Sequence, residues 1–375
     1  MIFTRSKHFT KTAPKDDKME NIVLKQDIEG LIDDCNLYEC FENKTILVTG
    51  ATGLIGSLIV KSFLAYAEKS KKKIKLIAVV RDRKKAIDIF RDYLSDFIDI
   101  VELDIVSKEI NFEEKVDYIF HCASRTASKD FVEKPVETIE TAIYGTNNIL
   151  KFANKKQVKA MVYLSSLEVY GIPQLGDEVS CLDEKQYKYL DPMEVRSSYS
   201  EGKRMVENLC VSYSVEYNVP VKIARLTQTF GAGINYNDTR VFAEFARCAV
   251  EGKDIVLYTK GETVRNYCYT IDAIRALLYI ALYGKNREAY NVANEDTAIS
   301  IYELAKRMSN CSQKKIKVVI DENNNLTKMY NPVMKVTLNN AKLKLLGWSS
   351  SYSLEEMIKR TFDWMESSKG YLSKC

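Results

Sequence analysis

The sequence predicts an α/β protein built on a parallel sheet with helices on both faces. Six apolar segments recur between residues 44 and 226, without the strict apolar–polar alternation of a half-exposed strand. Stretches with helical spacing of apolar residues separate these segments. The first segment also leads directly into a glycine-rich turn. Continuous apolar strands that alternate with helices are typical of parallel sheets, which helices bury on both sides.

The predicted elements follow one another in a regular order. Residues 1–18 are polar, and Met19–Phe41 has helical spacing of apolar residues, which predicts a helical arm that packs on the rest of the chain. Strands are expected at residues 44–49, 75–80, 98–105, 116–124, 158–166 and 221–226. We therefore divide the chain into a tail and arm (1–43), a sheet domain (44–226) and a smaller C-terminal α/β domain (227–263 and 295–375). The strand and helix within about 264–294 are expected to return to the large sheet.

Gly50, Gly53 and Gly56 form a GxxGxxG turn between the first strand and the helix that follows it. In such a turn the first glycine permits a tight bend, the second lets backbone approach a pyrophosphate, and the third lets helix and strand pack closely. The helix N-terminus offers free N–H groups and a positive dipole end to phosphates. These features predict a doubly wound Rossmann sheet that binds a dinucleotide; a tight turn without a ligand is the alternative. The residues expected at this part of the cofactor site are Gly50, Thr52, Gly53, Leu54, Ile55 and Gly56.

Arginines at the end of the second strand bear on the choice between NADP and NAD. Arg81 stands where an acidic residue would bind the ribose 2′-hydroxyl of NAD, and Arg83 follows two positions later. Because arginine pairs with phosphate, these residues favour NADP, whereas the neighbouring Asp82 could serve NAD. Asp104, at the end of the third strand, is placed to contact the adenine, with an ordinary strand-end cap as the alternative. The remaining residues of the expected cofactor site are Ile105, Ala123, Tyr199 and Lys203.

The composition of the 375-residue chain excludes several classes of protein. The net charge is +4 and no concentrated basic stripe is present, so nucleic acid is not an expected partner. Nine scattered cysteines without a CxxC pair predict free thiols in a reducing compartment. With two histidines, His8 and His121, multi-histidine zinc sites are excluded and no metal site is expected. The sequence has no signal-peptide core and no apolar run of ~18 residues, which predicts a cytoplasmic protein without membrane insertion.

Tyr199 and Lys203 share one face of the helix expected after the fifth strand. On its own this spacing is more often a feature of an exposed helix than a catalytic pair. Beside the nicotinamide pocket of a Rossmann sheet, however, a lysine ammonium would lower the pKa of the phenol from about 10 and make it a usable base for an alcohol proton. The end of the fifth strand supplies Ser166 and Glu168 nearby, and the serine hydroxyl could hydrogen-bond the same substrate oxygen.

Seven motifs in order resemble the extended short-chain dehydrogenase/reductases that modify nucleotide sugars, the NAD-dependent epimerase/dehydratase family. The motifs are TGATGLIG, HCAS, YLSSLEVYG, SSYSEGK, RLTQTFGAG, VRNYCYTIDA and LNNAKLKLLGW, and the resemblance spans roughly residues 44–365. It implies that Ser166, Tyr199 and Lys203 form a catalytic triad and that Lys203 also holds the nicotinamide ribose. It implies that the smaller domain binds a nucleotide sugar, with Arg265 on the pyrophosphate. The substrate-binding residues expected on this basis are Arg125, Ser166, Gln228, Arg240 and Arg265.

Within this family the chain most resembles UDP-glucuronate decarboxylases. The segments HCASRTASKDFVEKPVETIET, RSSYSEGKRMVE and DTRVFAEF are similar to theirs. Glu168 is a residue that decarboxylases and 4,6-dehydratases carry and many 4-epimerases lack. The chain departs from the decarboxylase pattern at Arg81, where an acidic residue is usual, and from many dehydratases at Leu167, where aspartate is usual. Further departures from the family pattern are Ala142, Gln228 and Ala232.

The resemblance implies a reaction that begins with oxidation of a sugar 4-hydroxyl, with Tyr199 as the base. The resulting 4-keto sugar can lose carbon dioxide, lose water with Glu168 as the base, or be reduced from its other face. Glu168 favours decarboxylation or dehydration, and a 4-epimerase or 4-keto-reductase is the alternative. A non-catalytic NADP-binding regulator is a further alternative, against which the intact triad argues. Similar enzymes pair through helices that correspond to Gly145–Ala153 and Tyr199–Tyr213, so a homodimer is expected.

Overall fold

A seven-stranded sheet forms the centre of the protein in the computed structural model, which describes residues 22–33, 36–172, 180–322 and 333–372. The strands lie in the order β11-β7-β5-β4-β1-β2-β3, and all neighbours are parallel. Their bounds are β1 Thr45–Thr49, β2 Lys75–Val80, β3 Ile98–Glu102, β4 Tyr118–His121, β5 Ala160–Ser166, β7 Val221–Leu226 and β11 Ala289–Val292. The strand order reverses between β1 and β4, and ligands of such sheets bind at that switch point, beyond the carboxyl ends of the strands.

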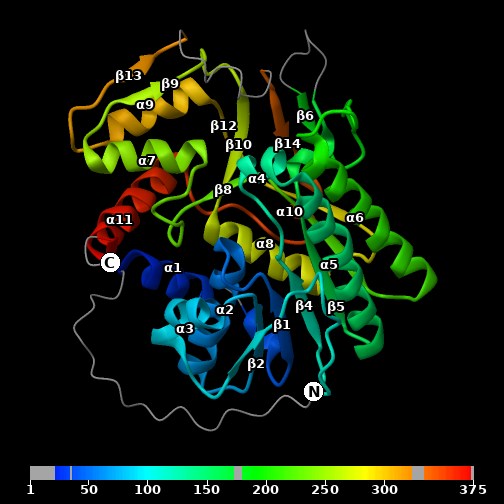
Figure 1. The fold of residues 1–375 in the computed structure, drawn as a ribbon. Helices are drawn as coiled ribbons and strands as arrows, with labels where there is room; N and C mark the ends of the chain where they lie inside the picture. The colour runs from blue at the N-terminus through cyan, green and yellow to red at the C-terminus, as the bar shows by residue number, and fades with distance from the viewer. Residues whose placement is uncertain (1–21, 34–35, 173–179, 323–332, 373–375) are drawn as a thin grey trace.

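Helices cover both faces of this sheet, as the apolar strands predict (Figure 1). Ile46 and Val48 of β1 point into a core shared with α2 (Leu54–Ser70), α3 (Arg83–Phe90) and α8 (Thr270–Tyr283). Leu47, between them, points into a second core with α5 (Pro135–Lys156) and α6 (Ser197–Glu216). Successive side chains of a strand face opposite sides of the sheet, so burial of both sides requires apolar residues throughout. The predicted doubly wound α/β fold is confirmed.

All six predicted strands are present, although four of them are shorter than expected: β1 begins one residue later and β5 two residues later, and β3 and β4 differ more. β3 ends at Glu102 and β4 spans Tyr118–His121, because the flanking residues form the turns at the strand ends. The sequence-based prediction missed the seventh strand, β11, which pairs with β7 at the edge of the sheet.

A smaller layer of structure lies beyond the carboxyl edge of the large sheet (Figure 1). Its three-stranded sheet has the order β12-β10-β8, with β8 Gln228–Phe230, β10 Val264–Tyr269 and β12 Asn294–Ser300. β10 was expected to return to the large sheet, and this expectation is wrong, because β10 pairs with β8 and β12. The helix α8 does pack on the large sheet, as expected, and β11 is the strand that joins it. The other elements of this part are α7 Val241–Glu251, β9 Ile255–Leu257, α9 Ile301–Cys311, β13 Val318–Ile320 and α11 Leu354–Leu372. β9 pairs with β13, and β6 (Ser180–Leu182) pairs with β14 (Val336–Leu338), which the short helix α10 (Ala341–Lys344) follows.

The N-terminal arm contains a helix, α1 (Ile22–Asp33), followed by a short 3₁₀ turn at Tyr38–Phe41. The helix packs against α2 and α8 of the large sheet and against α11 of the smaller part. Leu24, Ile28, Leu31 and Ile32 are buried, in agreement with the predicted apolar face. The predicted polar tail at residues 1–18 lies outside the described residues.

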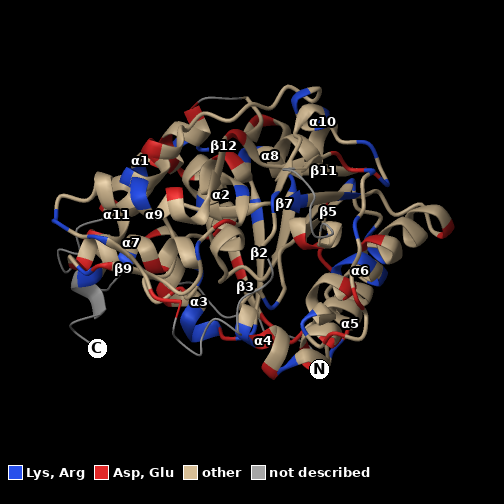
Figure 2. Ribbon diagram, turned by 90° about the horizontal axis from the view of Figure 1, so that it is seen from above, with Lys and Arg blue, Asp and Glu red and all other residues tan. Residues whose placement is uncertain are grey.

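The charged residues are spread over the molecule (Figure 2). Lys and Arg are interspersed with Asp and Glu in both layers. Within the described ranges no helix is both long and apolar enough to cross a membrane. The seven cysteines of those ranges are free, and no group of three or more His, Cys, Asp or Glu there could hold a metal ion.

Candidate active site

A cavity of about 510 Å³ opens between the carboxyl edge of the large sheet and the smaller layer. The large sheet contributes the glycine turn after β1, the end of β5 and the first turns of α6. The smaller layer contributes β8, the start of α7, β9 with the turn after it, and β10. The cavity therefore lies where the strand order predicts a ligand site.

The glycine turn leaves no room for side chains. Gly50 has φ +61°, and a Cβ there would lie 2.8 Å from the backbone of Ala123. A Cβ on Gly56 would lie 2.4 Å from the carbonyl oxygen of Gly50, so the start of α2 packs directly on the turn. Gly53 donates its N–H to Gly50 at 2.9 Å and precedes the first turn of α2. Gly50, Gly53, Leu54, Ile55 and Gly56 all line the cavity, which gives a cradle that a pyrophosphate fits.

Ser166, Tyr199 and Lys203 come together in this cavity, as the sequence predicts. Ser166 is the last residue of β5, while Tyr199 and Lys203 lie in the first two turns of α6. The hydroxyls of Ser166 and Ser124 hydrogen-bond the Tyr199 phenol. Lys203 is buried, donates to the carbonyl oxygen of Leu164 at 2.6 Å, and has its Nζ 5.7 Å from the centre of the Tyr199 ring.

The ionisation of Tyr199 differs from the sequence-based prediction. Burial raises the pKa of its phenol to about 12, and the two serine hydrogen bonds offset this only in part. Lys203 was expected to lower the pKa of this phenol, but its ammonium is turned to the Leu164 carbonyl. Burial lowers the pKa of Lys203 itself to about 8, against the opposing effect of Glu207. In this arrangement Tyr199 holds its proton at neutral pH.

Phe131, which the sequence-based prediction missed, supports the Tyr199 ring. It lies on α4 (Ser128–Glu133), and the two rings stack with centroids 4.3 Å apart and planes at 10°. The Ser198 hydroxyl donates to the Phe131 carbonyl oxygen at 2.9 Å, which ties α4 to α6. No sequence motif marks this residue, because the contact depends on how α4 and α6 meet.

Glu168 lies in the same cavity wall, in the short 3₁₀ helix Leu167–Tyr170. Its Oε2 accepts a hydrogen bond from Ser200 at 3.3 Å, and its Oε1 is 4.0 Å from Nη2 of Arg196. The side chain is 19% exposed, so it reaches the cavity without being freely solvated. The predicted group of Ser166, Glu168, Tyr199 and Lys203 is thus brought together.

Two of the three predicted substrate arginines face the cavity. Arg265 of β10 is buried, its Nη2 is 3.5 Å from the sulfur of Met334, and its Nη1 has no hydrogen-bond partner in the described part of the chain. Arg240 is held by Asp238 through bonds of 3.0 and 2.7 Å and also lines the cavity. Gln228 of β8 lines it as well. A buried guanidinium with a free donor is suited to an anionic ligand.

Tyr267 was missed by the sequence-based prediction, although it lies two residues after Arg265 on β10. Residues i and i+2 of a strand face the same side, and both side chains line the cavity. The Tyr267 hydroxyl is buried and has no hydrogen-bond partner among the described residues. Tyr267 could have been predicted from the sequence, because it lies two residues from Arg265 on the same strand and therefore on the same face.

Arg125 does not line the cavity, so its predicted substrate contact is not seen. Its guanidinium pairs instead with Asp130 of α4, at 3.1 Å, and with Glu137 of α5. These two acidic residues follow within the next turns of the chain and hold the arginine against the helices. The substrate contact of Arg125 therefore stays a prediction.

The remaining predicted cofactor residues lie beyond the cavity lining but at the same edge of the sheet. Arg81 follows β2 and is exposed; Asp82 caps α3 by accepting from the Lys85 N–H at 2.9 Å, and Arg83 donates to the Ile100 carbonyl. Asp104 accepts from the Val106 N–H at 3.0 Å, as in an ordinary turn. Ile105 is buried against Gly145, Ala123 lies against Gly50, and Thr52 is half-buried within the glycine turn.

The strand order and the glycine cradle at its switch point define a dinucleotide-binding α/β protein. Its sequence matches the NAD dependent epimerase/dehydratase family over residues 46–293, and the chain belongs to that family. The chain is therefore an NAD-dependent enzyme by class, as its motifs predict.

Similar proteins of known name agree with this assignment. UDP-glucuronic acid decarboxylase 1 of Xenopus tropicalis is 28% identical over 328 residues, which cover 85% of this chain and 72% of that one. UDP-glucuronic acid decarboxylase 6 of Arabidopsis thaliana is 30% identical over 318 residues, which cover 84% and 86% of the two chains. The solved structure of DesIV, a dTDP-glucose 4,6-dehydratase from Streptomyces venezuelae with NAD and TYD bound, superimposes with a TM-score of 0.71 at 22% identity, over 87% of this chain and 98% of that one.

Proposed function

We propose that the protein oxidises the 4-hydroxyl of a nucleotide-linked sugar and then decarboxylates it, with UDP-glucuronate as the first candidate substrate. One observation carries this proposal: Ser166, Tyr199 and Glu168 line a single cavity whose other wall presents Arg265, whose Nη1 has no hydrogen-bond partner among the described residues. The names of the relatives support the choice of decarboxylation. Dehydration of the same 4-keto sugar is the second candidate, because Glu168 lies where a base for it is needed.

The proposed first step is a proton transfer to Tyr199. Ser166 donates a hydrogen bond to the sugar oxygen while that oxygen becomes a ketone, and it also contacts the phenol. Phe131 holds the phenol ring in plane, which keeps the reacting oxygen atoms in one geometry. The raised pKa of Tyr199 means that positive charge must be placed beside the phenol before it can act as the base.

The glycine cradle and Lys203 are the proposed dinucleotide site. Gly50 and Gly56 let the turn pack closely on the backbone of Ala123 and on the start of α2, so the backbone of the turn borders the cavity where a pyrophosphate would bind, and Lys203 of the same cavity would hold a ribose. When bound, the dinucleotide supplies a hydride acceptor and the positive charge of its nicotinamide ring. Lys203 can add a second cation if its ammonium leaves the Leu164 carbonyl, which stabilises the deprotonated phenol of Tyr199.

The proposed second step depends on the sugar. In a 4-keto uronate the carboxylate on carbon 5 is β to the ketone, so its bond to carbon 5 breaks, carbon dioxide leaves, and the electron pair moves to the ketone oxygen. Carbon 5 then needs a proton, which Glu168, or a water it orients, delivers. Ser166 stabilises the charge on the oxygen until that proton arrives. Return of the hydride to carbon 4 and of the Tyr199 proton to the oxygen would close the cycle and leave the dinucleotide oxidised.

The proposed substrate site is the wall formed by β8, β10 and α7. Arg265, Arg240 and the Tyr267 hydroxyl supply donors for a pyrophosphate, and Gln228 borders the sugar. We propose on this basis that residues 227–263 and 295–375 form the substrate-binding domain. The pairing of α5 and α6 places Tyr144 and Met205, each 56% exposed, on the outer faces of the helices proposed to join two chains in a homodimer.

The finer choice of cofactor is proposed to be NADP. Arg81 is exposed at the end of β2, whereas the Asp82 carboxylate is engaged in capping α3 and so is less available to a ribose hydroxyl. The free cysteines fit the proposed location in a reducing compartment such as the cytoplasm.

The test is to incubate the protein with UDP-, GDP-, CDP- and dTDP-linked sugars, uronates included, and to measure product masses. Loss of carbon dioxide from a UDP-linked uronate is expected, and Tyr199→Phe should abolish it while the dinucleotide still binds. Loss of water would move the assignment to the dehydratase, and an unchanged mass with a new sugar would move it to the epimerase. Absence of any product together with absence of nicotinamide reduction would favour the non-catalytic alternative.

A further inference from the structure

The helix α1 joins the two layers of the molecule, although it precedes the glycine turn in the chain. It packs on α2 and α8 of the large sheet and on α11 of the smaller layer. Figure 1 shows it between α2 and α11. A helix in this place can set how the two walls of the cavity stand relative to one another.

Asp27 is the polar centre of this contact. Its side chain is fully buried, which an isolated carboxylate would not tolerate. The Tyr269 hydroxyl donates to its Oδ2 at 2.5 Å and Nε of Arg360 donates to its Oδ1 at 2.7 Å, while the Tyr352 hydroxyl lies 3.5 Å from Oδ1. One carboxylate of the arm therefore ties down the end of β10, the helix α11 and the segment that leads into α11.

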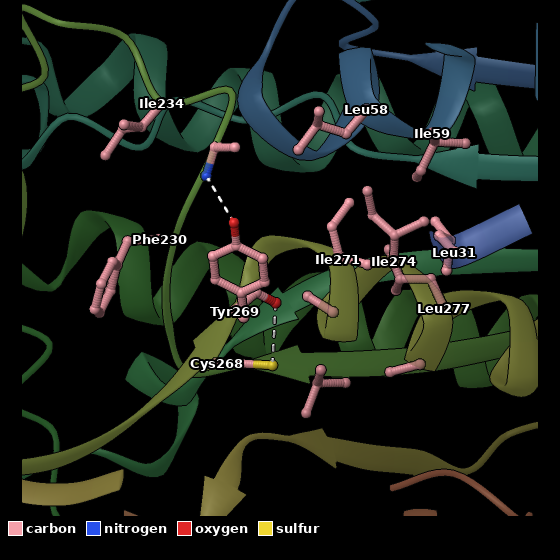
Figure 3. Packing of buried hydrophobic residues seen from close by; sticks show 14 of the residues in the cluster. Leu31, Leu58, Ile59, Phe230, Ile234, Cys268, Tyr269, Ile271, Ile274 and Leu277 are labelled. Carbon is pink, nitrogen blue, oxygen red and sulfur yellow. Dashed lines mark hydrogen bonds between the residues drawn. The ribbon is translucent and has the colours of Figure 1, made fainter. Parts of the chain in front are cut away.

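Tyr269 connects Asp27 to the cavity. It is the last residue of β10, the strand that carries Arg265 and Tyr267. Its ring lies against Gly231, where a Cβ would be 2.4 Å from Cε2 of the ring, and its hydroxyl accepts from the Ala232 N–H at 3.5 Å. Figure 3 shows this bond, with Phe230 and Ile234 on one side and Ile271, Ile274 and Leu31 on the other.

The strands β8 and β10 transmit this restraint. They pair in parallel, with Tyr269 opposite Phe230 and Tyr267 opposite Gln228. A shift at Tyr269 must therefore move Arg265 and Tyr267 along one strand and Gln228 on the other. The dinucleotide cradle, in contrast, is built on the end of β1 and the first turn of α2, and the atoms that lie nearest to Gly50, Gly53 and Gly56 do not come from β8 or β10.

We propose that Asp27 is a positioning residue that acts through Tyr269 to hold the β8–β10 wall of the cavity in register for an anionic, pyrophosphate-bearing substrate. This inference rests on the proposed function of that wall. The carboxylate touches no cavity residue itself, so it affects substrate binding only through the strand end that it fixes.

The test compares binding of UDP and of NAD to the full-length protein by titration calorimetry. Asp27→Ala is expected to weaken UDP by about tenfold and to change NAD affinity less than about twofold. Asp27→Asn keeps an oxygen acceptor for the Tyr269 hydroxyl and is expected to restore most of the UDP affinity. Asp33→Ala, an exposed residue of the same helix that pairs with Lys69, is the matched control and should change neither affinity.

Tyr269→Phe covers the case in which Asp27→Ala does not fold. It removes the hydroxyl, keeps the ring against Gly231, and is expected to weaken UDP and to raise hydrogen–deuterium exchange in residues 228–232 and 264–269 without changing exchange in β1 and α2. Equal loss of UDP and NAD affinity, or unchanged exchange at β8 and β10, overturns the inference. If the unmodified protein binds no UDP, the proposed function fails, and the exchange measurement still decides the role of Asp27.

Discussion

Glu168 shares one wall of the cavity with Ser166 and Tyr199, and its carboxylate accepts a single weak hydrogen bond, from Ser200, in the described part of the chain. This freedom matters for the second step of the proposed reaction, in which carbon 5 loses or gains a proton. Glu168→Gln should therefore lower turnover by more than roughly tenfold, on the scale of acid–base groups. Reduction of the nicotinamide in a single turnover, followed by absorbance, should remain visible because Tyr199 is untouched.

A matched control for this variant is Glu133→Gln, since Glu133 lies on the surface of α4 and pairs with Lys129. It should leave turnover unchanged. Full turnover of Glu168→Gln with the same product would contradict both the decarboxylase and the dehydratase proposals, because a 4-epimerase needs no second acid or base.

Arg81 is the residue on which the cofactor preference depends. Its exposed guanidinium stands at the end of β2, where the 2′-phosphate of NADP would lie. Arg81→Ala should weaken NADP by roughly tenfold and NAD by much less, because one charge-assisted phosphate contact is lost. Fluorescence titration of both cofactors measures this difference. Arg91→Ala, an exposed arginine of the next turn that pairs with Asp88, serves as the control. Tighter binding of NAD than NADP by the unmodified protein would contradict the preference.

Single residues show where sequence reasoning succeeds and where it cannot. The position of Arg265 in the cavity wall could be predicted, because its motif indicates a strand and the side chains of a strand alternate between its two faces. The ion pairs of Arg125 with Asp130 and Glu137 could not be predicted, because they depend on how α4 and α5 pack. The pKa of Tyr199 was predicted in the wrong direction for a similar reason: burial, which the sequence does not state, raises it, and the ammonium of Lys203 is directed to the Leu164 carbonyl oxygen.

At the level of elements, the glycine turn gives the sharpest prediction. In Gly56→Ala the new Cβ would lie 2.4 Å from the Gly50 carbonyl oxygen, so α2 must move away from the turn. Dinucleotide affinity should fall by at least about tenfold, as measured by titration. Gly30→Ala is the control, because a Cβ at that helical position meets nothing within 4 Å. It should raise the unfolding free energy by roughly 0.5–1 kcal/mol and leave cofactor affinity unchanged. Unchanged affinity in Gly56→Ala would contradict the cradle.

The strands also show which elements the pattern of apolar residues can predict and which it cannot. Six apolar segments were long and apolar enough to predict, whereas β11 is four residues long and includes the buried Asn291. That asparagine is satisfied by the Tyr170 hydroxyl and by the carbonyl oxygens of Leu182 and Asn339, which are distant in sequence. β10 was recognised as a strand but assigned to the wrong sheet, because its buried pattern would fit either one.

At the scale of the whole molecule, the proposed homodimer can be measured directly. Light scattering should give about twice the 43.0 kDa mass of the chain. Replacing both Tyr144 and Met205 with lysine should shift the mass to that of one chain, because charges would then be buried in an apolar contact between α5 and α6 of two copies.

Val319→Lys supplies the control for this experiment. Val319 is 42% exposed on β13, away from α5 and α6, so its substitution should not change the mass. A single-chain mass for the unmodified protein would contradict the proposed dimer.

The buried contact between Asp27 and Arg360 has a consequence for synthesis on the ribosome, because 333 residues separate its two ends. At translation rates of about 5–20 residues per second, roughly 20–70 s pass between the appearance of the carboxylate and that of its guanidinium partner. The helix α2, on which the arm packs, is therefore synthesised long before α11, and the Asp27 carboxylate lacks its guanidinium partner until then. Docking of α1 on α11 is therefore among the final steps of folding. A chain that ends before α11 lacks Arg360, so the Asp27 carboxylate of its arm has no guanidinium partner.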